Sequence, residues 1–169
     1  MRKLSIVTLC ILFLAAVAYA DEAKKPLSPP AKAEATVNGK KVTIAYSAPS
    51  RRDRAIMGAL VPYGKVWRTG ANAATTLKTE ADLMLGTLHV PAGTYTLYTI
   101  PGETEWTLIV NKQTGQWGTN YDEAQDLGRV TMKVSPVKDT VETFVIGIDK
   151  SALSLTWENT RATVPVMVH

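Results

Sequence analysis

Short runs that alternate between apolar and polar residues, each ended by a turn, are the feature that most limits how this chain can fold. In Thr94 to Ile100, Tyr95 and Leu97 alternate with Thr94, Thr96 and Tyr98, and in the next run Trp106, Leu108 and Val110 alternate with Thr107 and Ile109. This period of two places successive side chains on opposite faces of a β-strand. Two further runs of this kind, 35–37 and 42–46, are separated by Asn38-Gly39. This pair readily adopts the positive φ angles of a type I′ hairpin turn. Helix signals are nearly absent, so the sequence predicts an all-β protein.

About nine or ten short strands are expected, at the spacing typical of an antiparallel sandwich or barrel. They are expected among eleven candidate segments, within residues 35–37, 42–46, 75–79, 82–85, 88–90, 94–100, 106–110, 130–134, 144–148, 153–157 and 164–166. We predict a single antiparallel β-sandwich, jelly-roll or immunoglobulin-like. Its expected core contains Leu97, Trp106, Phe144, Ile146 and Trp157, because large apolar side chains gain most from burial.

The first twenty residues are typical of a secretory signal peptide. Arg2 and Lys3 precede an apolar run over 4–17, and Ala18-Tyr19-Ala20 supplies the small residues of a cleavage site. We therefore predict cleavage after Ala20, a periplasmic or secreted protein, and no transmembrane segment in the mature chain. Residues 21–32 are polar and rich in proline, which predicts a flexible leader. The β-sandwich domain is then expected over residues 33–169.

Charge and cysteine content exclude several classes of function. Loss of Arg2 and Lys3 with the signal peptide lowers the formal charge from +4 to +2, which is too small to indicate a nucleic-acid partner. The basic cluster 51–54 is accordingly predicted to be a solvated loop. The only cysteine, Cys10, also leaves with the signal peptide. No disulfide or thiolate ligand then remains.

Motifs for catalysis and for cofactors are missing from the sequence. The only histidines are His89 and the C-terminal His169, so a zinc or copper site is disfavoured. No Gly-x-Ser-x-Gly turn, phosphate-binding glycine loop or dinucleotide fingerprint is present, and neither cofactor nor metal is expected.

Two long segments without alternation, 48–72 and 111–127, are the candidate functional loops, because irregular connections on a rigid sheet often carry function. The first holds two aromatic residues and two cations within eleven positions. Apolar rings with polar tips and the planar fork of Arg68 are suited to binding a ligand. The candidate ligand-binding residues are Tyr63, Trp67, Arg68, Asn72, Trp117, Tyr121, Asp122 and Glu158.

Arg68 has a second interpretation. It could be a buried anchor that pairs with Glu158 or Asp122 beneath a core Trp67, because an unpaired buried arginine is very costly. The Thr69-Gly70 turn directly after it slightly favours this anchoring role. Asp122 or Glu158 could instead serve a hydrolase together with Arg68, since paired carboxylates carry out glycosidase chemistry.

Four longer stretches resemble a known family. They are VPYGKVWRTGANAATT (61–76), PAGTYTLYTIPGETEWTLIVNK (91–112), QWG with YDEAQDLGRV (116–130) and WENT with VPV (157–166). Together they are similar to the bacterial family of unknown function DUF2911, over about residues 28–166. The resemblance implies an exported, β-rich domain with no established activity.

Three functions therefore remain open for this chain. The first is a non-enzymatic binding module for a small ligand, such as a saccharide or a peptide of the cell envelope, held where the two irregular loops meet. The second is a hydrolase that uses Asp122 or Glu158 with Arg68. The third is a structural envelope protein without a small ligand. A concave pocket that joins Trp67, Arg68 and a carboxylate with a raised pKa would favour chemistry, and a flat aromatic surface would favour binding. Full burial of Trp67 and Arg68 in an ion pair would favour the structural role.

Overall fold

Strands account for almost all the regular structure of the computed structural model, which describes residues 26–168. The elements are β1 (Pro30–Val37), β2 (Lys40–Ser47), β3 (Thr75–Thr79), β4 (Leu83–Leu85), β5 (Leu88–Val90), β6 (Gly93–Ile100), β7 (Glu105–Asn111), the 3₁₀ turn η1 (Glu123–Gln125), β8 (Asp126–Ile148) and β9 (Ala152–Val168). The strands pair antiparallel in the order β1-β2-β3-β6-β7-β8-β9-β4-β5. The predicted all-β antiparallel class is confirmed.

The β1–β2 hairpin forms where the alternation and the Asn-Gly pair predict it. Its register ends at Val37 opposite Lys40, around Asn38 (φ 50°) and Gly39 (φ 75°). Strand β1 begins at Pro30, so the strand starts inside the segment 21–32 that the sequence analysis assigns to a leader. Proline is tolerated there because the first residue of a strand need not donate a hydrogen bond to the ladder.

Strands β8 and β9 are much longer than the sequence predicts. Each merges two expected strands: 130–134 with 144–148, and 153–157 with 164–166. The pairing between them shifts register between Pro136 and Val141 and again before Val145. Such bulges bend a strand without ending it. They interrupt the alternation over 135–143, so the sequence predicts two strands where the backbone forms one.

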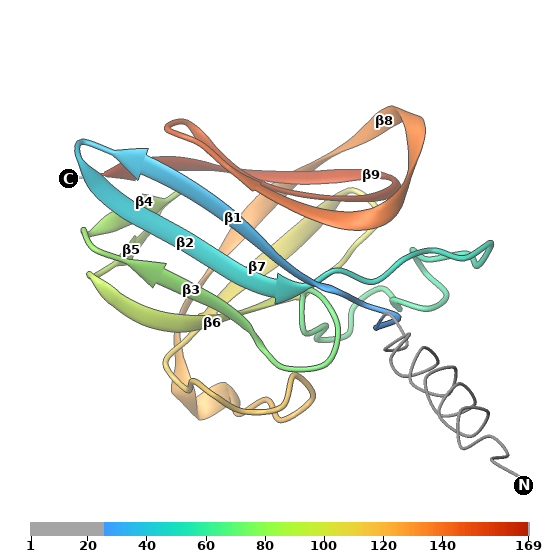
Figure 1. Ribbon diagram of the computed structural model, residues 1–169, viewed down its shortest axis with the longest axis horizontal. Coiled ribbons are helices and arrows are strands. Elements are labelled where there is room, and N and C mark those ends of the chain that lie inside the picture. Colours follow the sequence, from blue (N-terminus) through green and yellow to red (C-terminus); the bar gives the residue numbers. More distant parts are fainter. Residues whose placement is uncertain (1–25, 169) are drawn as a thin grey trace, which may run out of the picture.

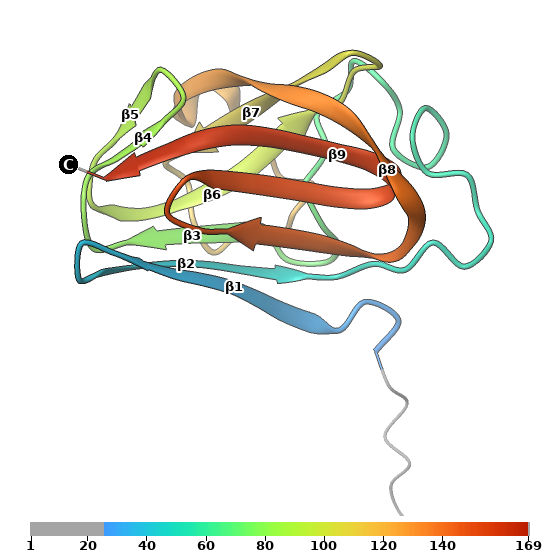
Figure 2. The same ribbon diagram turned by 90° about the horizontal axis from the view of Figure 1, so that it is seen from above.

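The bent β8–β9 hairpin gives the molecule its overall shape. It lies across the core from β3 and β6 (Figures 1 and 2). All nine strands belong to one sheet whose order ends at β1 and β5. The predicted division into the two sheets of a jelly-roll or immunoglobulin-like sandwich is therefore not confirmed, because one sheet folds over the core by itself.

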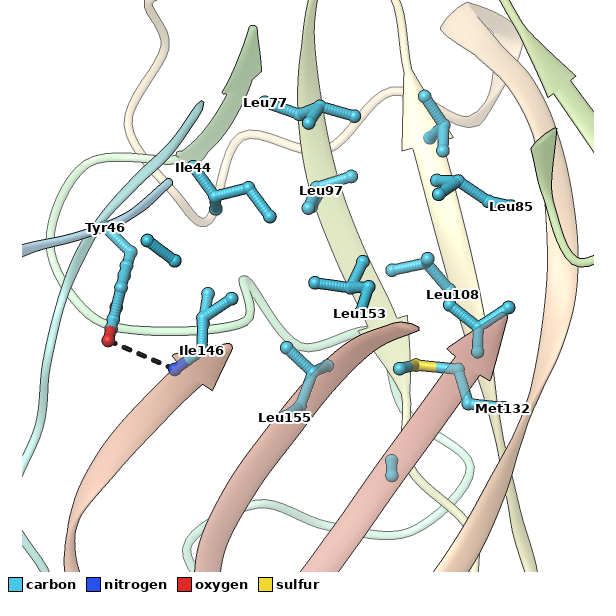
Figure 3. Close-up of a cluster of buried hydrophobic side chains, with 14 of the residues drawn as sticks. Ile44, Tyr46, Leu77, Leu85, Leu97, Leu108, Met132, Ile146, Leu153 and Leu155 are labelled. Carbon is cyan, nitrogen blue, oxygen red and sulfur yellow. Dashed lines mark hydrogen bonds between the residues drawn. The ribbon is translucent and has the colours of Figure 1, made fainter. Parts of the chain in front are cut away.

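The five predicted core residues are all buried, none with more than 3% of its surface exposed. Leu153 and Leu155 of β9 enter the core from one side and lie beside Leu97 of β6 and Leu108 of β7, which enter it from the other (Figure 3). Trp106 Nε1 has no hydrogen-bond partner among the described residues, but another buried polar pair of the core is satisfied. The Ile146 N–H donates to the Tyr46 hydroxyl at 3.1 Å, the bond drawn in Figure 3. The core thus forms a rigid base for the irregular segments.

Those two irregular segments are joined by backbone hydrogen bonds. The Gly118 N–H donates to the Asn72 carbonyl at 3.0 Å, and the Ala74 N–H to the Gln116 carbonyl at 3.2 Å. Tertiary structure therefore brings together loops that lie about 45 residues apart in the chain. The predicted signal peptide and its cleavage site lie outside the described residues. Within residues 26–168, no helix is long and apolar enough to cross a membrane.

Candidate functional site

A cavity of about 630 Å³ opens where the two irregular segments meet. Its walls come mainly from residues 49–71 and 118–121, with Tyr98 of β6 and Trp157 of β9 at the sheet. The volume falls within the range of about 300–1,000 Å³ that is typical of small-molecule sites. Trp67, Arg68 and Tyr121, three of the predicted site residues, line it.

Trp67 belongs both to the core and to the wall of the cavity. Its ring stacks on Trp157 with centroids 5.9 Å apart and planes inclined by 17°, and it meets Phe144 edge-on at 5.0 Å. Its backbone pairs with Thr99 of β6 through hydrogen bonds of 2.7 and 2.9 Å. The binding and core interpretations of Trp67 are thus compatible, because the side chain packs on the core yet is only half-buried and lines the cavity.

Two tyrosines form a second aromatic wall. The rings of Tyr98 and Tyr121 meet edge-on with centroids 4.8 Å apart. The Tyr121 hydroxyl donates to Asp126 Oδ2 at 2.7 Å and accepts from Arg129 Nη2 at 2.9 Å. Burial, together with the hydrogen bond to Asp126, raises the pKa of Tyr121 to about 12. Tyr121 therefore stays neutral at physiological pH and offers the cavity a fixed ring.

Four cationic side chains line the cavity: Arg52, Arg54, Lys65 and Arg68. No carboxylate lies among the described lining residues, and none of the ion pairs found within residues 26–168 involves these four side chains. Arg54 is held by its own loop: Nε donates to the Arg51 carbonyl at 2.9 Å and Nη2 to the Ser50 carbonyl at 2.8 Å. The cavity wall is consequently positive and lacks a counter-charge from the described part of the chain.

The backbone next to Arg68 is strained. Thr69 has φ 53° and is fully buried, a conformation that is a true outlier for a β-branched residue. It is held by hydrogen bonds: Thr75 Oγ1 donates to the Thr69 carbonyl at 2.8 Å, and the hydroxyls of Thr69 and Thr99 lie 3.2 Å apart. Strain that the surrounding structure maintains is common at ligand sites, and the strained Thr69 directly follows Arg68 in the chain.

Gly118 provides the surface over which the Arg68 side chain passes. A Cβ added at Gly118 would lie 2.5 Å from Arg68 Cδ and 2.7 Å from the Asn72 carbonyl oxygen. Because the second of these atoms is backbone, the close approach of the two loops requires glycine at this position. The aliphatic part of Arg68 is thus packed, while its guanidinium has no hydrogen-bond acceptor within residues 26–168.

Glu158 lies outside the cavity and organises the loop behind it. Its carboxylate accepts from the Ile56 N–H at 3.3 Å and the Met57 N–H at 3.2 Å, and Arg51 Nε lies 3.5 Å from Oε1. Arg51, rather than Arg68, is therefore its charge partner. The predicted anchoring of Arg68 by Glu158 or Asp122 is not found.

The other predicted residues do not line the cavity. Asp122 accepts from the Ala124 N–H at 3.0 Å and so caps η1. Tyr63 packs beside Gly58, and Trp117 is 53% exposed next to Ala73. Asn72 contributes its carbonyl to the contact between the loops. The structure thus brings together Trp67, Arg68 and Tyr121 and leaves Tyr63, Asn72, Trp117, Asp122 and Glu158 outside.

The sequence analysis missed several lining residues, chiefly Arg52, Arg54, Lys65, Tyr98 and Gly118. The basic cluster 51–54 was the available signal, and its prediction as a solvated loop is wrong for Arg51 and Arg54, which are half-buried and bonded. Tyr98 carried no signal beyond strand alternation. Its place in the wall depends on the other loop folding back to β6.

Comparison with known proteins identifies a family but no function. A family model described as a protein of unknown function (DUF2911) matches residues 28–166. No curated protein and no solved structure matches the chain. Within residues 26–168, no group of three His, Cys, Asp or Glu side chains is arranged to hold a metal ion.

Proposed function

The chain belongs to the DUF2911 family, whose function is unknown, and we propose that it is a non-enzymatic binding module for a small organic ligand. The ligand would occupy the cavity between the loops 49–71 and 118–121. We further propose that the protein acts in the periplasm or outside the cell, as the sequence of residues 1–20 predicts.

The observation that carries the proposal is the combination of aromatic walls with unpaired cations in a cavity of about 630 Å³. Binding sites are typically apolar cavities with a few converging polar groups. Trp67 and Tyr121 supply partly exposed aromatic surface that packs on the buried rings of Trp157 and Tyr98. Arg68 supplies a donor fork that forms no ion pair in the described chain. Such a site is preorganised, so ordering it on binding costs little.

The two other functions are less well supported by the geometry. A hydrolase built on Asp122 or Glu158 needs a carboxylate facing the ligand, but these two groups bind backbone N–H groups outside the cavity. A purely structural role predicts that Trp67 and Arg68 are fully buried in an ion pair. Instead, these two side chains are half-buried and line the cavity.

A thermal-shift screen of the protein purified from its producing cells tests the proposal. Intact mass of that protein first establishes its N-terminus, which is expected at Asp21. The screen covers neutral saccharides, short peptides and organic anions. A ligand at a hundred times its Kd stabilises the protein by about 2.7 kcal/mol, which corresponds to a rise in Tm of about 5–10 °C for this size.

Two matched variants show whether the cavity is responsible. Val66 lies on the cavity wall and is 40% exposed, and Val145 of β8 is exposed to a similar extent but does not line the cavity. Val66→Trp is expected to abolish the ligand-induced shift, and Val145→Trp to leave it intact. A screen in which no class of ligand raises Tm, or a shift that persists in Val66→Trp, would contradict the proposal.

A further inference from the structure

The charge of the cavity defines the ligand more narrowly than its shape does. Arg52, Arg54, Lys65 and Arg68 line one cavity without a described carboxylate. Arg54 and Arg68 are half-buried, whereas Arg52 and Lys65 are exposed. Keeping a half-buried cation unpaired is unfavourable. A ligand that brings negative charge removes that cost, whereas a neutral saccharide or peptide does not.

Hydrogen-bonding capacity favours an anion with several oxygens. A guanidinium has five N–H donors in a planar fork. Arg54 uses two of its donors on the carbonyls of Ser50 and Arg51, and Arg68 uses none on any residue within 26–168. A phosphate monoester carries up to two charges and three acceptor oxygens, which suits several converging cations better than the single charge of a carboxylate.

The cavity is also too large and too apolar for an inorganic ion alone. Beside the cations, its walls include the half-buried rings of Trp67 and Tyr121 and the exposed side chains of Leu60 and Val66. An organic group can lie against these surfaces and gain the free energy of apolar burial. The ligand is therefore expected to have a charged end and an apolar or ring-shaped body.

We infer that the cavity binds a phosphorylated organic molecule, with the phosphate monoester at the arginines and the organic body against the aromatic walls. This inference rests on the proposed function. The phosphate monoester is the chemistry being recognised, and it belongs either to a soluble molecule or to a lipid such as phosphatidic acid, whose headgroup is a phosphate monoester.

Tryptophan fluorescence titration of the full exported protein tests the inference, because the half-buried Trp67 lines the cavity and stacks on the buried Trp157. Trp117→Phe serves as the background, since it removes the exposed indole outside the cavity. The soluble probes are phenyl phosphate, benzoate, phenol and inorganic phosphate. Vesicles of phosphatidic acid, compared with vesicles of phosphatidylcholine, provide the lipid source.

Phenyl phosphate is expected to bind at least about tenfold more tightly than benzoate or inorganic phosphate, and phenol is expected not to bind. Raising the NaCl concentration should weaken this binding, because ions screen the attraction. Arg68→Gln, which retains most of the side-chain length, and Arg54→Lys, which retains the charge but not the fork, should each raise Kd about tenfold or more. Lys78→Ala, an exposed lysine of β3 outside the cavity, should leave Kd unchanged.

Binding of phosphatidic acid vesicles without binding of phenyl phosphate supports the phosphate chemistry and assigns the ligand to the membrane. Equal affinity for benzoate and phenyl phosphate, or unchanged Kd in Arg68→Gln and Arg54→Lys, overturns the inference. If the thermal-shift screen finds a neutral ligand that Val66→Trp excludes while phosphate esters fail, the inference is wrong and the proposed function stands.

Discussion

On the outer face of the β1–β2 hairpin, Lys32 and Lys41 share the carboxylate of Glu34, with Nζ to Oε1 distances of 2.5 and 3.0 Å. The cations in the cavity have no such partner within residues 26–168. In the hairpin, the register places the two lysines and the glutamate side by side on exposed neighbouring strands. In the cavity, two loops and the sheet bring several cations together, and no carboxylate of the described chain lines the same cavity.

The difference shows what each cluster can do. An exposed ion pair neutralises its own charge and contributes little to stability, because water already solvates both groups. A set of unpaired cations in a partly enclosed space is instead maintained by the structure around it, here by the strained Thr69 and the close approach at Gly118. The hairpin cluster is therefore a local surface feature, whereas the cavity cluster is available to a ligand.

Unlike either cluster, Glu158 is a partly buried carboxylate that holds backbone N–H groups. Its removal is expected to have the largest effect on stability. Glu158→Ala removes the acceptor for the Ile56 and Met57 N–H groups and leaves Arg51 without its carboxylate. The expected cost is about 2–4 kcal/mol, or a decrease in Tm of about 5–15 °C. Thermal melts measure it. Glu158→Gln keeps an acceptor oxygen and should cost less, so equal melts for wild type and Glu158→Ala would show that this carboxylate does not hold the loop.

Arg68 is expected to give a smaller change in stability. Arg68→Ala breaks no ion pair of the described residues, so it should change the free energy of unfolding by less than about 1 kcal/mol and Tm by less than about 2–4 °C. Arg68→Lys should melt in the same range. A decrease in Tm of 10 °C in calorimetry of Arg68→Ala would instead restore the anchoring role, because breaking a buried pair costs about 3–5 kcal/mol.

The smallest effect is expected at Glu34, and it should depend on pH. Hydrogen bonds from Lys32 and Lys41 lower the pKa of Glu34 from 4.5 to about 2. A folded-state pKa below that of the unfolded chain means that the carboxylate stabilises the fold above pH 4.5, and that this contribution is lost as the pH falls toward 2.

Comparison of Glu34→Gln with wild type measures this contribution. We expect a difference in Tm of about 1 °C or less at pH 7, which disappears by about pH 2 as Glu34 becomes protonated. Lys138→Gln, which replaces an exposed lysine of β8, is a control that should show no such pH dependence. A Tm difference that grows in acid would show that Glu34 does not act through its ionised form.

The parts of the fold that the sequence predicts are those encoded by short stretches of consecutive residues. The β1–β2 hairpin and β3 lie where alternation predicted them, because side-chain period and turn chemistry are properties of a few consecutive residues. Strands β8 and β9 were each predicted as two shorter strands. Their continuity depends on bulged pairing between distant residues, such as Val141 with Glu158, and no local pattern reports such pairing.

By itself, the sequence determined the all-β class, the buried aromatic core and the loop in which Trp67 and Arg68 stand. Hydrophobic alternation carries this information, because burial of one strand face follows directly from period two. Only the tertiary structure decided that the sheet folds over as one piece, that Glu158 pairs with Arg51, and that Arg54 and Tyr121 face the same cavity as Arg68. These features depend on contacts between loops far apart in the chain. Their geometry follows from strand pairing and from the hydrogen bonds of Gly118 and Thr69, which no spacing of residues along the sequence expresses.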